Sequence, residues 1–403
     1  MREDPRRLCF EITARDGAAR TGLLHTPHGP IRTPAFVPLA TTATVKSLDA
    51  PEVAELGFDM VLGNTFHLDL RPGRERIERF GGLHAFMGWD RPIITDSGGF
   101  QVFSLAHGSV ADEIKGRGGQ RRSEGAILEI AEEGVRFRSY LDGDERFIGP
   151  ETSMEIQAAL GSDIALAFDE CTPFHADRGY TARSMQRTHR WLTRCADWHR
   201  EHGPAGQALY GIVQGGIHPD LRAEAAGVVG DAEIDGIAIG GTLGDSKEQM
   251  LAVLDDTLGH LPAAAPRHLL GIGEIDDLLA GSARGIDTFD CAVPTRLARH
   301  GMAMGPFPES RYRVDLAKGR YADDADPPVP GCPCPACRHT RGYLHYLHKA
   351  GEMTAVRLLT LHNLHFVQYL MAGVRAAIIA GTLAAYAEAI ARGAAPWDEA
   401  DAP

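Results

Sequence analysis

The sequence lacks the long apolar segment that a membrane span requires. Its most alanine-rich stretch, 372–392, is interrupted by Arg375 and Glu388, whereas a spanning helix needs about 20 consecutive apolar residues. The first residues, MREDPRRLCFEIT, place Glu3 and Asp4 among arginines and contain no apolar core of a secretory signal. We therefore expect a cytoplasmic protein with no membrane partner.

Cysteine is scarce and unevenly placed. The chain has seven cysteines, an odd number, and three of them crowd together in the sequence CPCPAC at Cys332, Cys334 and Cys337. One metal site in a reducing compartment fits this pattern better than a framework of disulfides.

Positive charge is in deficit. Lys and Arg number 41 against 54 Asp and Glu, which gives a formal net charge of −13. Such a chain repels nucleic acid at long range, so a polyanionic partner must be held by a local basic surface. The contents of 44% hydrophobic and 24% charged residues are ordinary for a globular protein and exclude a disordered or collagen-like chain.

Eight short apolar runs recur along the chain, most of them separated by amphipathic stretches of helical length such as 48–55 and 247–257. Runs that are apolar on both faces are typical of buried parallel strands. Eight alternating β and α units predict an α/β fold of the (β/α)8 TIM-barrel type. The runs are 35–37, 59–62, 92–94, 164–168, 209–213, 236–239, 268–272 and 286–289.

Two segments do not fit the regular alternation. Between the third and fourth runs, a basic, Gly-rich loop precedes the hairpin-like sequence VRFRSYLDGDERF with its Asp-Gly turn, which predicts a flap insertion around 105–150. After the eighth run come the cysteine cluster and a long Ala-rich helix. We predict a barrel over 1–300, an inserted zinc-binding subdomain over 301–365, and a C-terminal helix over 366–403 that completes the barrel.

Carboxylates follow three of the predicted strands: Asp96 after the third, Asp169 after the fourth and Asp290 after the eighth. The C-terminal ends of TIM-barrel strands meet at one mouth. Two carboxylates on either side of an anomeric carbon can act as nucleophile and acid in glycosidic bond chemistry. A single Asp at such a place is more often a helix N-cap or a turn residue, but three together favour glycosyl transfer.

Gln214 follows the fifth strand and is either a partner for backbone groups or part of a base-binding site. With Asp169 it suits the Watson–Crick edge of guanine, because a carboxylate accepts from N1–H and the 2-amino group while an amide donates to O6. Glycine pairs at 98–99, 215–216 and 240–241 are individually no more than turn signals. Together they permit close backbone approach to a flat ligand.

The three clustered cysteines can wrap one tetrahedral ion, and a fourth ligand must come from further along the chain. The spacing indicates a structural ion, since no open position or activating Glu is evident, and it makes a chance cluster of buried cysteines improbable. It does not choose the fourth ligand. The candidates are His339, His345, His348, His362 and His365.

Six motifs occur in a fixed order: DSGGFQVFSL, FDECTPF, GIVQGG, FDCAVPTRLARHG, CPCPAC and LLTLHNLHF. With them the sequence resembles the tRNA-guanine transglycosylases of bacterial type (queuine or queuosine-precursor tRNA-ribosyltransferases), from about Asp16 to the C-terminal helix. The resemblance implies exchange of the wobble guanine of a tRNA anticodon loop for a 7-deazaguanine base, by double displacement through a covalent RNA–enzyme intermediate. It also implies one structural zinc ion and a homodimer.

The resemblance assigns a role to each matching residue. Asp290 is implied as the nucleophile on C1′ of the guanosine and Asp96 as the general acid and base. The implied zinc ligands are Cys332, Cys334, Cys337 and His362, the last being the histidine of the HN pair. The implied base-binding residues are Ser97, Gly98, Gly99, Phe100, Asp169, Gln214, Gly241 and Thr242. The implied RNA contacts are Arg296, Arg299, Gly271 and Gly273, beside further basic residues between Arg311 and Lys349.

One segment departs from the family pattern. Bacterial members usually read GGL-x-VGE after the sixth strand, whereas this chain reads GGTLGD over 240–245, one residue shorter and with Asp in place of Glu. This leaves the incoming base open between the aminomethyl queuosine precursor, queuine and another 7-deazaguanine. An archaeosine enzyme is disfavoured, since the C-terminal part leaves no room for the extra RNA-binding domain of those enzymes.

Three other functions would use part of the same set of residues. A retaining glycosidase on the same barrel also needs two carboxylates, but it usually lines its subsites with aromatic residues, which make up only 7% of this chain. A binding-only partner subunit would be expected to lack the nucleophile. A relative that modifies another nucleic acid, such as DNA, would share the base chemistry and differ only in its docking surface.

Overall fold

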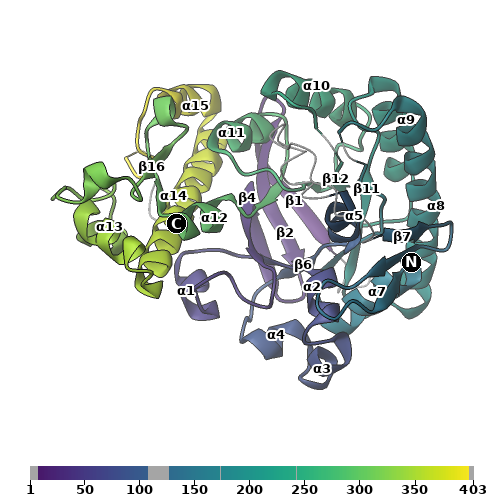
Figure 1. Ribbon diagram of the computed structural model, residues 1–403. Coiled ribbons are helices and arrows are strands. Elements are labelled where there is room, and N and C mark those ends of the chain that lie inside the picture. The colour runs from purple at the N-terminus through teal and green to yellow at the C-terminus, as the bar shows by residue number, and fades with distance from the viewer. Residues whose placement is uncertain (1–7, 108–126, 173, 242, 399–403) are drawn as a thin grey trace.

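The computed structural model of the chain describes residues 8–107, 127–172, 174–241 and 243–398. Its centre is a closed barrel of eight parallel strands, and the strands follow one another around the barrel in chain order (Figure 1). Each of the eight predicted runs overlaps one barrel strand, so the predicted (β/α)8 fold is confirmed. The strands are β4 (Ala35–Ala40), β5 (Val61–Gly63), β6 (Ile93–Thr95), β10 (Ile164–Leu166), β11 (Ala208–Val213), β12 (Gly236–Ile239), β13 (Arg267–Leu269) and β14 (Thr288–Cys291).

Helices surround the barrel on the outside (Figure 1). Their apolar faces pack on the barrel; Trp191 of a 25-residue outer helix, for example, lies with its ring centre 5.0 Å from that of Phe168, which follows β10. The helices are α1 (Ala50–Glu55), α2 (Thr65–Leu70), α3 (Arg74–Arg79), α4 (Gly82–Met87), α5 (Gly99–His107), α7 (Pro150–Leu160), α8 (Arg178–His202), α9 (Pro219–Gly230), α10 (Lys247–Leu258) and α11 (Ile275–Ala283). The stretches predicted as helical at 48–55 and 247–257 correspond to α1 and α10.

An antiparallel sheet of β1 (Cys9–Asp16), β2 (Ala19–Thr26) and β3 (Gly29–Thr33) precedes the barrel and was not predicted. Its Leu24 and Ile31 are buried in one apolar cluster with inward-facing barrel residues. Arg20 of β2 also connects the sheet to the barrel, because its guanidinium donates to both carboxylate oxygens of the buried Asp287, directly before β14, at 2.8 and 2.5 Å. The barrel is therefore closed at the end where its strands begin.

The predicted hairpin is confirmed as β8 (Val135–Arg138) and β9 (Glu145–Ile148), which pair antiparallel. A third strand, β7 (Ile127–Ile130), pairs with β8. The basic Gly-rich part of the predicted flap, 108–126, lies outside the described residues.

A smaller unit follows α12 (Val293–Arg299), the helix after the last barrel strand. Its elements are β15 (Met302–Met304), η1 (Pro308–Ser310), β16 (Arg313–Asp315), η2 (Gly319–Tyr321), η3 (Pro335–Arg338) and α13 (Arg341–Lys349). The 28-residue helix α14 (Met353–Ala380) packs against both η3 and the barrel. It runs across the predicted boundary at 365, and the division into 1–300, 301–365 and 366–403 stays a prediction.

The Ala-rich C-terminal segment contains two helices where one was expected. Gly381 ends α14 in a left-handed conformation with φ of 70°, which glycine adopts without steric cost, and α15 (Leu383–Ala391) follows. Among the described residues, none of the helices combines the length and apolarity needed to cross a bilayer.

Candidate active site

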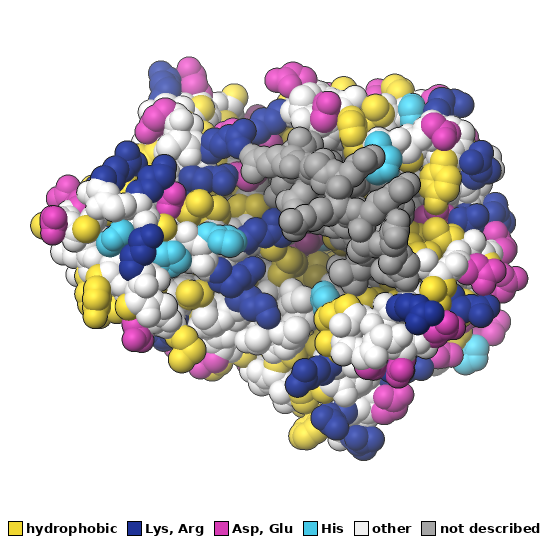
Figure 2. Space-filling view, viewed as in Figure 1, with side chains coloured by type: hydrophobic (Ala, Val, Ile, Leu, Met, Phe, Trp, Pro, Cys, Tyr) yellow, Lys and Arg dark blue, Asp and Glu magenta, His cyan; other side chains and the backbone are white. Residues whose placement is uncertain are grey.

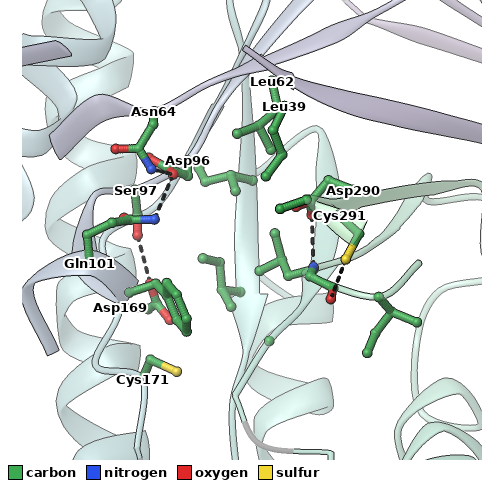
Figure 3. A pocket seen from close by; sticks show the side chains of 18 of the residues that line it. Leu39, Leu62, Asn64, Asp96, Ser97, Gln101, Asp169, Cys171, Asp290 and Cys291 are labelled. Carbon is green, nitrogen blue, oxygen red and sulfur yellow. Dashed lines mark hydrogen bonds between the residues drawn. The ribbon is translucent and has the colours of Figure 1, made fainter. Parts of the chain in front are cut away.

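A pocket of about 210 Å³ opens where the barrel strands end, and Asp96, Asp169 and Asp290 all line it. Figure 3 shows Asp96 and Asp169 on one side of the pocket and Asp290 on the other. The remaining wall is largely apolar and includes Leu39, Leu62, Leu166, Ile212, Leu243 and Leu270. A base bound against this apolar wall would exclude water from between the carboxylates and so reduce the screening of charges that develop there.

Asp96 follows β6 and is held by the start of α2. Its two carboxylate oxygens accept from the side-chain amide of Asn64 and, at 2.9 Å, from the backbone N–H of Thr65. Gln101 of α5 donates to it at 3.2 Å. Burial raises the pKa of Asp96 to about 7, partly countered by the backbone hydrogen bond from Thr65 and reinforced by the negative charge of Asp290. A carboxyl group with such a pKa can both give and take a proton near neutral pH.

Asp169 follows β10 and points at the same space. Ser97 Oγ donates to one of its oxygens at 2.8 Å, and the Gln214 amide nitrogen donates to the other at 2.6 Å. Burial raises the pKa of Asp169 to about 6, although both hydrogen bonds oppose the shift. The carboxylate therefore has fixed orientation, and it is largely ionised at neutral pH.

Asp290 lies in β14 and is 7% exposed. Its Oδ1 accepts two hydrogen bonds: from the backbone N–H of Gly271 at 3.0 Å and from Nε2 of His268 at 3.1 Å. His268 stands on the neighbouring strand β13 and is 0% exposed. Its Nδ1 lies 2.8 Å from the hydroxyl of Thr288. Since a carboxylate only accepts, Nε2 carries the hydrogen and Nδ1 accepts from the Thr288 hydroxyl.

A buried arginine holds the backbone around the pocket by hydrogen bonds to its carbonyl groups. Arg222 of α9 is 0% exposed, and its guanidinium donates to the carbonyls of Val213, Gly216 and Gly240. These carbonyls belong to the ends of β11 and β12. Gly241 has φ of 76°, and a Cβ atom there would stand 2.3 Å from the Gln214 side-chain oxygen. A side chain at this position would displace the amide that holds Asp169.

The predicted base-binding and RNA-binding residues divide into three groups. Asp96, Ser97, Phe100, Asp169, Gly241, Gly271, Asp290 and Arg296 line the pocket. Gln214 and Gly99 are not among the lining residues but adjoin Asp169: the Gln214 amide donates to its carboxylate, and a Cβ at Gly99 would meet its carbonyl oxygen at 2.5 Å. Gly98, Gly273 and Arg299 lie beside the pocket without lining it, and Thr242 lies outside the described residues.

Sequence reasoning missed His268, Arg222 and Glu170. Glu170, beside Asp169, is 1% exposed and is held from α8 by Arg187 at 2.5 Å and Tyr180 at 2.6 Å. His268 carried a usable signal, because it is a polar residue inside an otherwise apolar strand. Arg222 carried none, since an arginine on an amphipathic helix is usually solvated.

The loop after β12 does not bring its carboxylate to the pocket. Leu243 is buried and lines the wall, whereas Asp245 is exposed and its backbone N–H donates to the Gln249 side chain at 3.1 Å. The described part of this loop therefore presents the uncharged side chain of Leu243 to the pocket, and not the carboxylate of Asp245.

Lys and Arg side chains gather on the face over α12 and β16 (Figure 2). Of the basic residues expected on this surface, Arg313, Lys318 and Arg341 are paired with Glu274, Asp315 and Asp324. The others form no ion pair among the described residues, and they are Arg296, Arg299, Arg311, Arg320, Arg338 and Lys349. A local positive surface thus adjoins the pocket on a chain of net negative charge.

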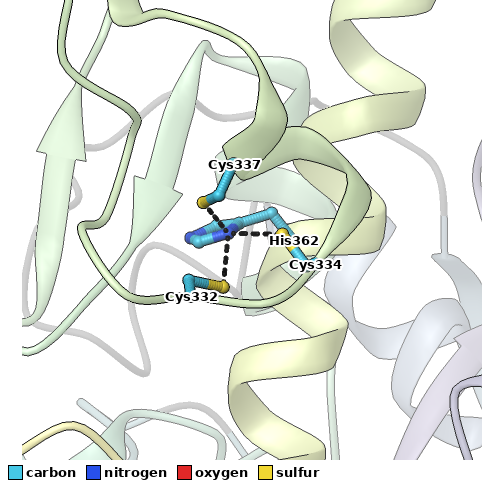
Figure 4. A group of neighbouring side chains, drawn as sticks. All are labelled: Cys332, Cys334, Cys337 and His362. Carbon is cyan, nitrogen blue, oxygen red and sulfur yellow. Dashed lines mark hydrogen bonds between the residues drawn. The ribbon is translucent and has the colours of Figure 1, made fainter.

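Cys332, Cys334, Cys337 and His362 meet in one cluster that could hold a metal ion (Figure 4). The three sulfur atoms lie 3.7, 3.2 and 3.4 Å from Nδ1 of His362. A tetrahedral zinc ion with its usual bond lengths requires about 3.5 Å between S and N. Nε2 of His362 donates to the Met304 carbonyl at 2.6 Å, which turns Nδ1 toward the sulfurs.

The other candidate histidines are placed elsewhere. His345 Nδ1 donates to the Leu316 carbonyl at 2.7 Å. Neither it nor His348 belongs to the cluster. The structure thus brings together the ligand set that the resemblance implied.

Comparisons with known proteins agree over nearly the whole chain. The model of the queuine tRNA-ribosyltransferase family matches residues 16–396. A queuine tRNA-ribosyltransferase of Roseiflexus sp. (strain RS-1) is 48% identical over 389 residues, covering 94% of this chain and 97% of that protein. The protein of the same name from Novosphingobium aromaticivorans is 47% identical over 388 residues, with 94% and 97% covered. That from Thiobacillus denitrificans is 48% identical over 371 residues, with 92% and 94% covered.

Proposed function

Because the chain belongs to the queuine tRNA-ribosyltransferase family, we propose that it is a pentosyltransferase which replaces the wobble guanine of target tRNA anticodons by a 7-deazaguanine base. The observation that carries this proposal is the pocket in which Asp290 faces Asp96 and Asp169 across an apolar gap. A sugar carbon between these groups can be attacked from one side while its base is held and protonated on the other.

The base is recognised through its Watson–Crick edge. The ionised Asp169 accepts from N1–H and the 2-amino group of guanine. The Gln214 amide has two hydrogens, of which Asp169 takes one, and the second is free to donate to O6. A 7-deazaguanine carries the same edge, so the same groups bind the leaving and the incoming base.

The reaction proceeds in two displacements at C1′. Asp290 attacks C1′ of the guanosine, the C1′–N9 bond breaks, and Asp96 gives its proton to the departing guanine. The 7-deazaguanine then enters, Asp96 takes the proton from N9–H of this base, and N9 attacks C1′. The ester bond between C1′ and Asp290 breaks, and both carboxyl groups return to their first states.

His268 acts as a positioning residue for the nucleophile. Its Nε2–H and the N–H of Gly271 both bind Oδ1 of Asp290, which leaves Oδ2 as the oxygen free to attack. The carboxylate of Asp290 selects the tautomer with hydrogen on Nε2, and the Thr288 hydroxyl, which can donate, complements that tautomer at Nδ1. The attacking oxygen is thereby presented in one orientation, and the same two donors support the carboxylate as it leaves in the second displacement.

The Cys3His cluster suits zinc, because three thiolates and one imidazole are the donors of structural zinc sites. We assign Cys332, Cys334, Cys337 and His362 as its ligands. A bound ion would supply cross-links between η3 and α14 and no chemistry at the pocket.

The tRNA anticodon loop would dock on the basic surface beside the pocket, with Arg296 and Arg299 at its centre and Gly271 and Gly273 at its edge. We further propose a cytoplasmic homodimer. The exposed side chains of Tyr346 and Met353 offer apolar area that a second copy would cover. Sedimentation equilibrium of the purified protein measures this assembly.

Trapping the covalent intermediate tests the function. Incubating the protein with an anticodon stem-loop RNA should give a denaturant-resistant RNA–protein adduct and release guanine, and Asp290→Asn should abolish both. Asp245→Asn removes an exposed carboxylate of the neighbouring loop and should leave both intact. An adduct that persists in Asp290→Asn would overturn the nucleophile assignment, and adduct formation with the matching DNA hairpin instead of RNA would favour the alternative nucleic acid.

A further inference from the structure

A second group of metal-binding residue types lies at the opposite end of the barrel from the pocket. His28 is in the turn between β2 and β3, His84 is on α4, and Asp163 directly precedes β10. Within the described ranges, this is one of two groups whose donor atoms all lie within 4.8 Å of one another, the other being the Cys3His cluster. The transglycosylation site uses none of these three residues.

The three donor atoms are already arranged at metal-like separations. His28 Nδ1 lies 2.8 Å from one oxygen of Asp163, and His84 Nε2 lies 3.2 Å from the other. The two imidazole rings stack with centres 3.6 Å apart and planes 16° from parallel. Bonds of 2.0–2.1 Å to a tetrahedral ion place its ligand atoms about 3.3 Å apart, which the two N–O separations match. Because an imidazole holds a metal in its own ring plane, the exposed His28 ring would have to tilt out of the stack to share one ion with His84.

The carboxylate is oriented before any ion arrives. The Asp163 side chain is 0% exposed, and it accepts from the backbone N–H of Ile93 at 2.8 Å and that of His28 at 3.3 Å. Such outer hydrogen bonds hold a ligand in place and strengthen metal sites. No Lys or Arg pairs with Asp163 within the described part of the chain. A cation at the two imidazoles would therefore compensate a buried negative charge.

One side of the group is open to solvent. The His28 side chain is 42% exposed, whereas that of His84 is 13% exposed. An ion can enter past His28, and water can complete its coordination. Two imidazoles with one carboxylate favour zinc, cobalt or nickel over the hard cations magnesium and calcium, which prefer oxygen ligands.

We propose that His28, His84 and Asp163 bind a divalent transition-metal ion of the zinc class, with water as the remaining ligand. The ion would join the β2–β3 turn, α4 and the start of β10, and so fasten the N-terminal sheet to the barrel. This site is independent of the proposed transglycosylation.

Metal titration of the purified full-length protein tests the site. Protein carrying one zinc equivalent is dialysed against chelator-buffered Zn²⁺ and, separately, titrated with Co²⁺. We expect a second equivalent of zinc, and visible Co²⁺ absorption without the sulfur-to-metal charge-transfer band that a thiolate site gives. His84→Ala should lower the affinity for this second equivalent at least tenfold while the first is retained.

Two more variants guard against a folding defect and a nonspecific effect. His28→Ser changes an exposed turn, so the protein should fold, and it should also lose the second equivalent. His25→Ala removes a neighbouring exposed imidazole whose Nε2 lies 3.8 Å from a carboxylate oxygen of Glu11, and this variant should retain the second equivalent. Absence of a second equivalent in the unmodified protein, or its persistence in both His28→Ser and His84→Ala, would overturn the proposal.

Discussion

Replacing His268 by Phe would remove one of the two hydrogen bonds that hold Oδ1 of the proposed nucleophile Asp290. A buried hydrogen bond to a charged group contributes about 1.5–3 kcal/mol, which corresponds to a rate effect of about 10- to 150-fold. Phe fills a similar volume, so the barrel should remain folded. Since Gly271 still donates to Oδ1, activity should fall without vanishing. We expect the loss in the rate of adduct formation, with little change in the KM for RNA.

His268→Gln gives the matched control, because its side-chain nitrogen can reach the place of Nε2 and donate in the same way. This variant should recover most of the rate that His268→Phe loses. Single-turnover quenched-flow measurements with radiolabelled stem-loop RNA would give the rates directly. If His268→Phe forms the adduct as fast as the unmodified protein, or if the Gln variant is equally slow although its folding is intact, His268 does not position the nucleophile.

Three further outcomes are expected. The rate of guanine release should rise as pH increases through about 6, because Asp169, with its pKa of about 6, must be ionised to bind the base. The rate should fall above about pH 7, because Asp96, with its pKa of about 7, then loses the proton that it must donate. A rate that is constant from pH 5 to 8 would contradict these roles. Elemental analysis should find one zinc equivalent fewer in His362→Ala than in His345→Ala, with a lower melting temperature only in the first; equal zinc in both would refute the ligand assignment. When guanine and the aminomethyl base compete for one tRNA, guanine exchange should survive. The preference for the aminomethyl base should be weaker than in enzymes with the usual loop, because Leu243 rather than a carboxylate lines the pocket. A strong aminomethyl preference that Asp245→Ala abolishes would contradict this and show that the loop closes on the base.

The barrel could be predicted from sequence because its strands are buried on both faces, and each therefore appears as a short apolar run. The N-terminal sheet was missed because it differs from these runs: β1 alternates between exposed and half-buried residues, the period-two pattern of a strand with one exposed face, and so contains no continuous apolar run. The alternation indicates a strand, but it does not show that Leu24 and Ile31 of this sheet pack against barrel residues, which depends on tertiary packing.

The residues of the candidate site also divide into those that sequence pattern could predict and those that depend on tertiary packing. Asp96, Asp169 and Asp290 were found because each ends or follows an apolar run, and strand ends meet in a barrel. His268 lies inside the predicted seventh strand, so the argument from strand ends does not select it. Only the structure shows that its imidazole donates to Asp290 on the neighbouring strand. Spacing could not choose His362 among five histidines either, because the choice depends on how α14 crosses η3, which is a property of packing.

Helix α14 has a consequence for any attempt to treat the C-terminal region as a detachable module. His362 faces the cysteine cluster, and the next residue, Asn363, accepts from the backbone of Met304 at 2.7 Å and donates to the carbonyls of Pro294 and Met302 at 2.9 and 3.0 Å. Pro294 belongs to α12, which carries Arg296. Helix α14 thus connects the metal-binding cluster to α12, and through Arg296 of α12 to the wall of the pocket. A chimera that exchanges the cysteine loop between relatives would therefore need to transfer α14 together with its contacts to α12.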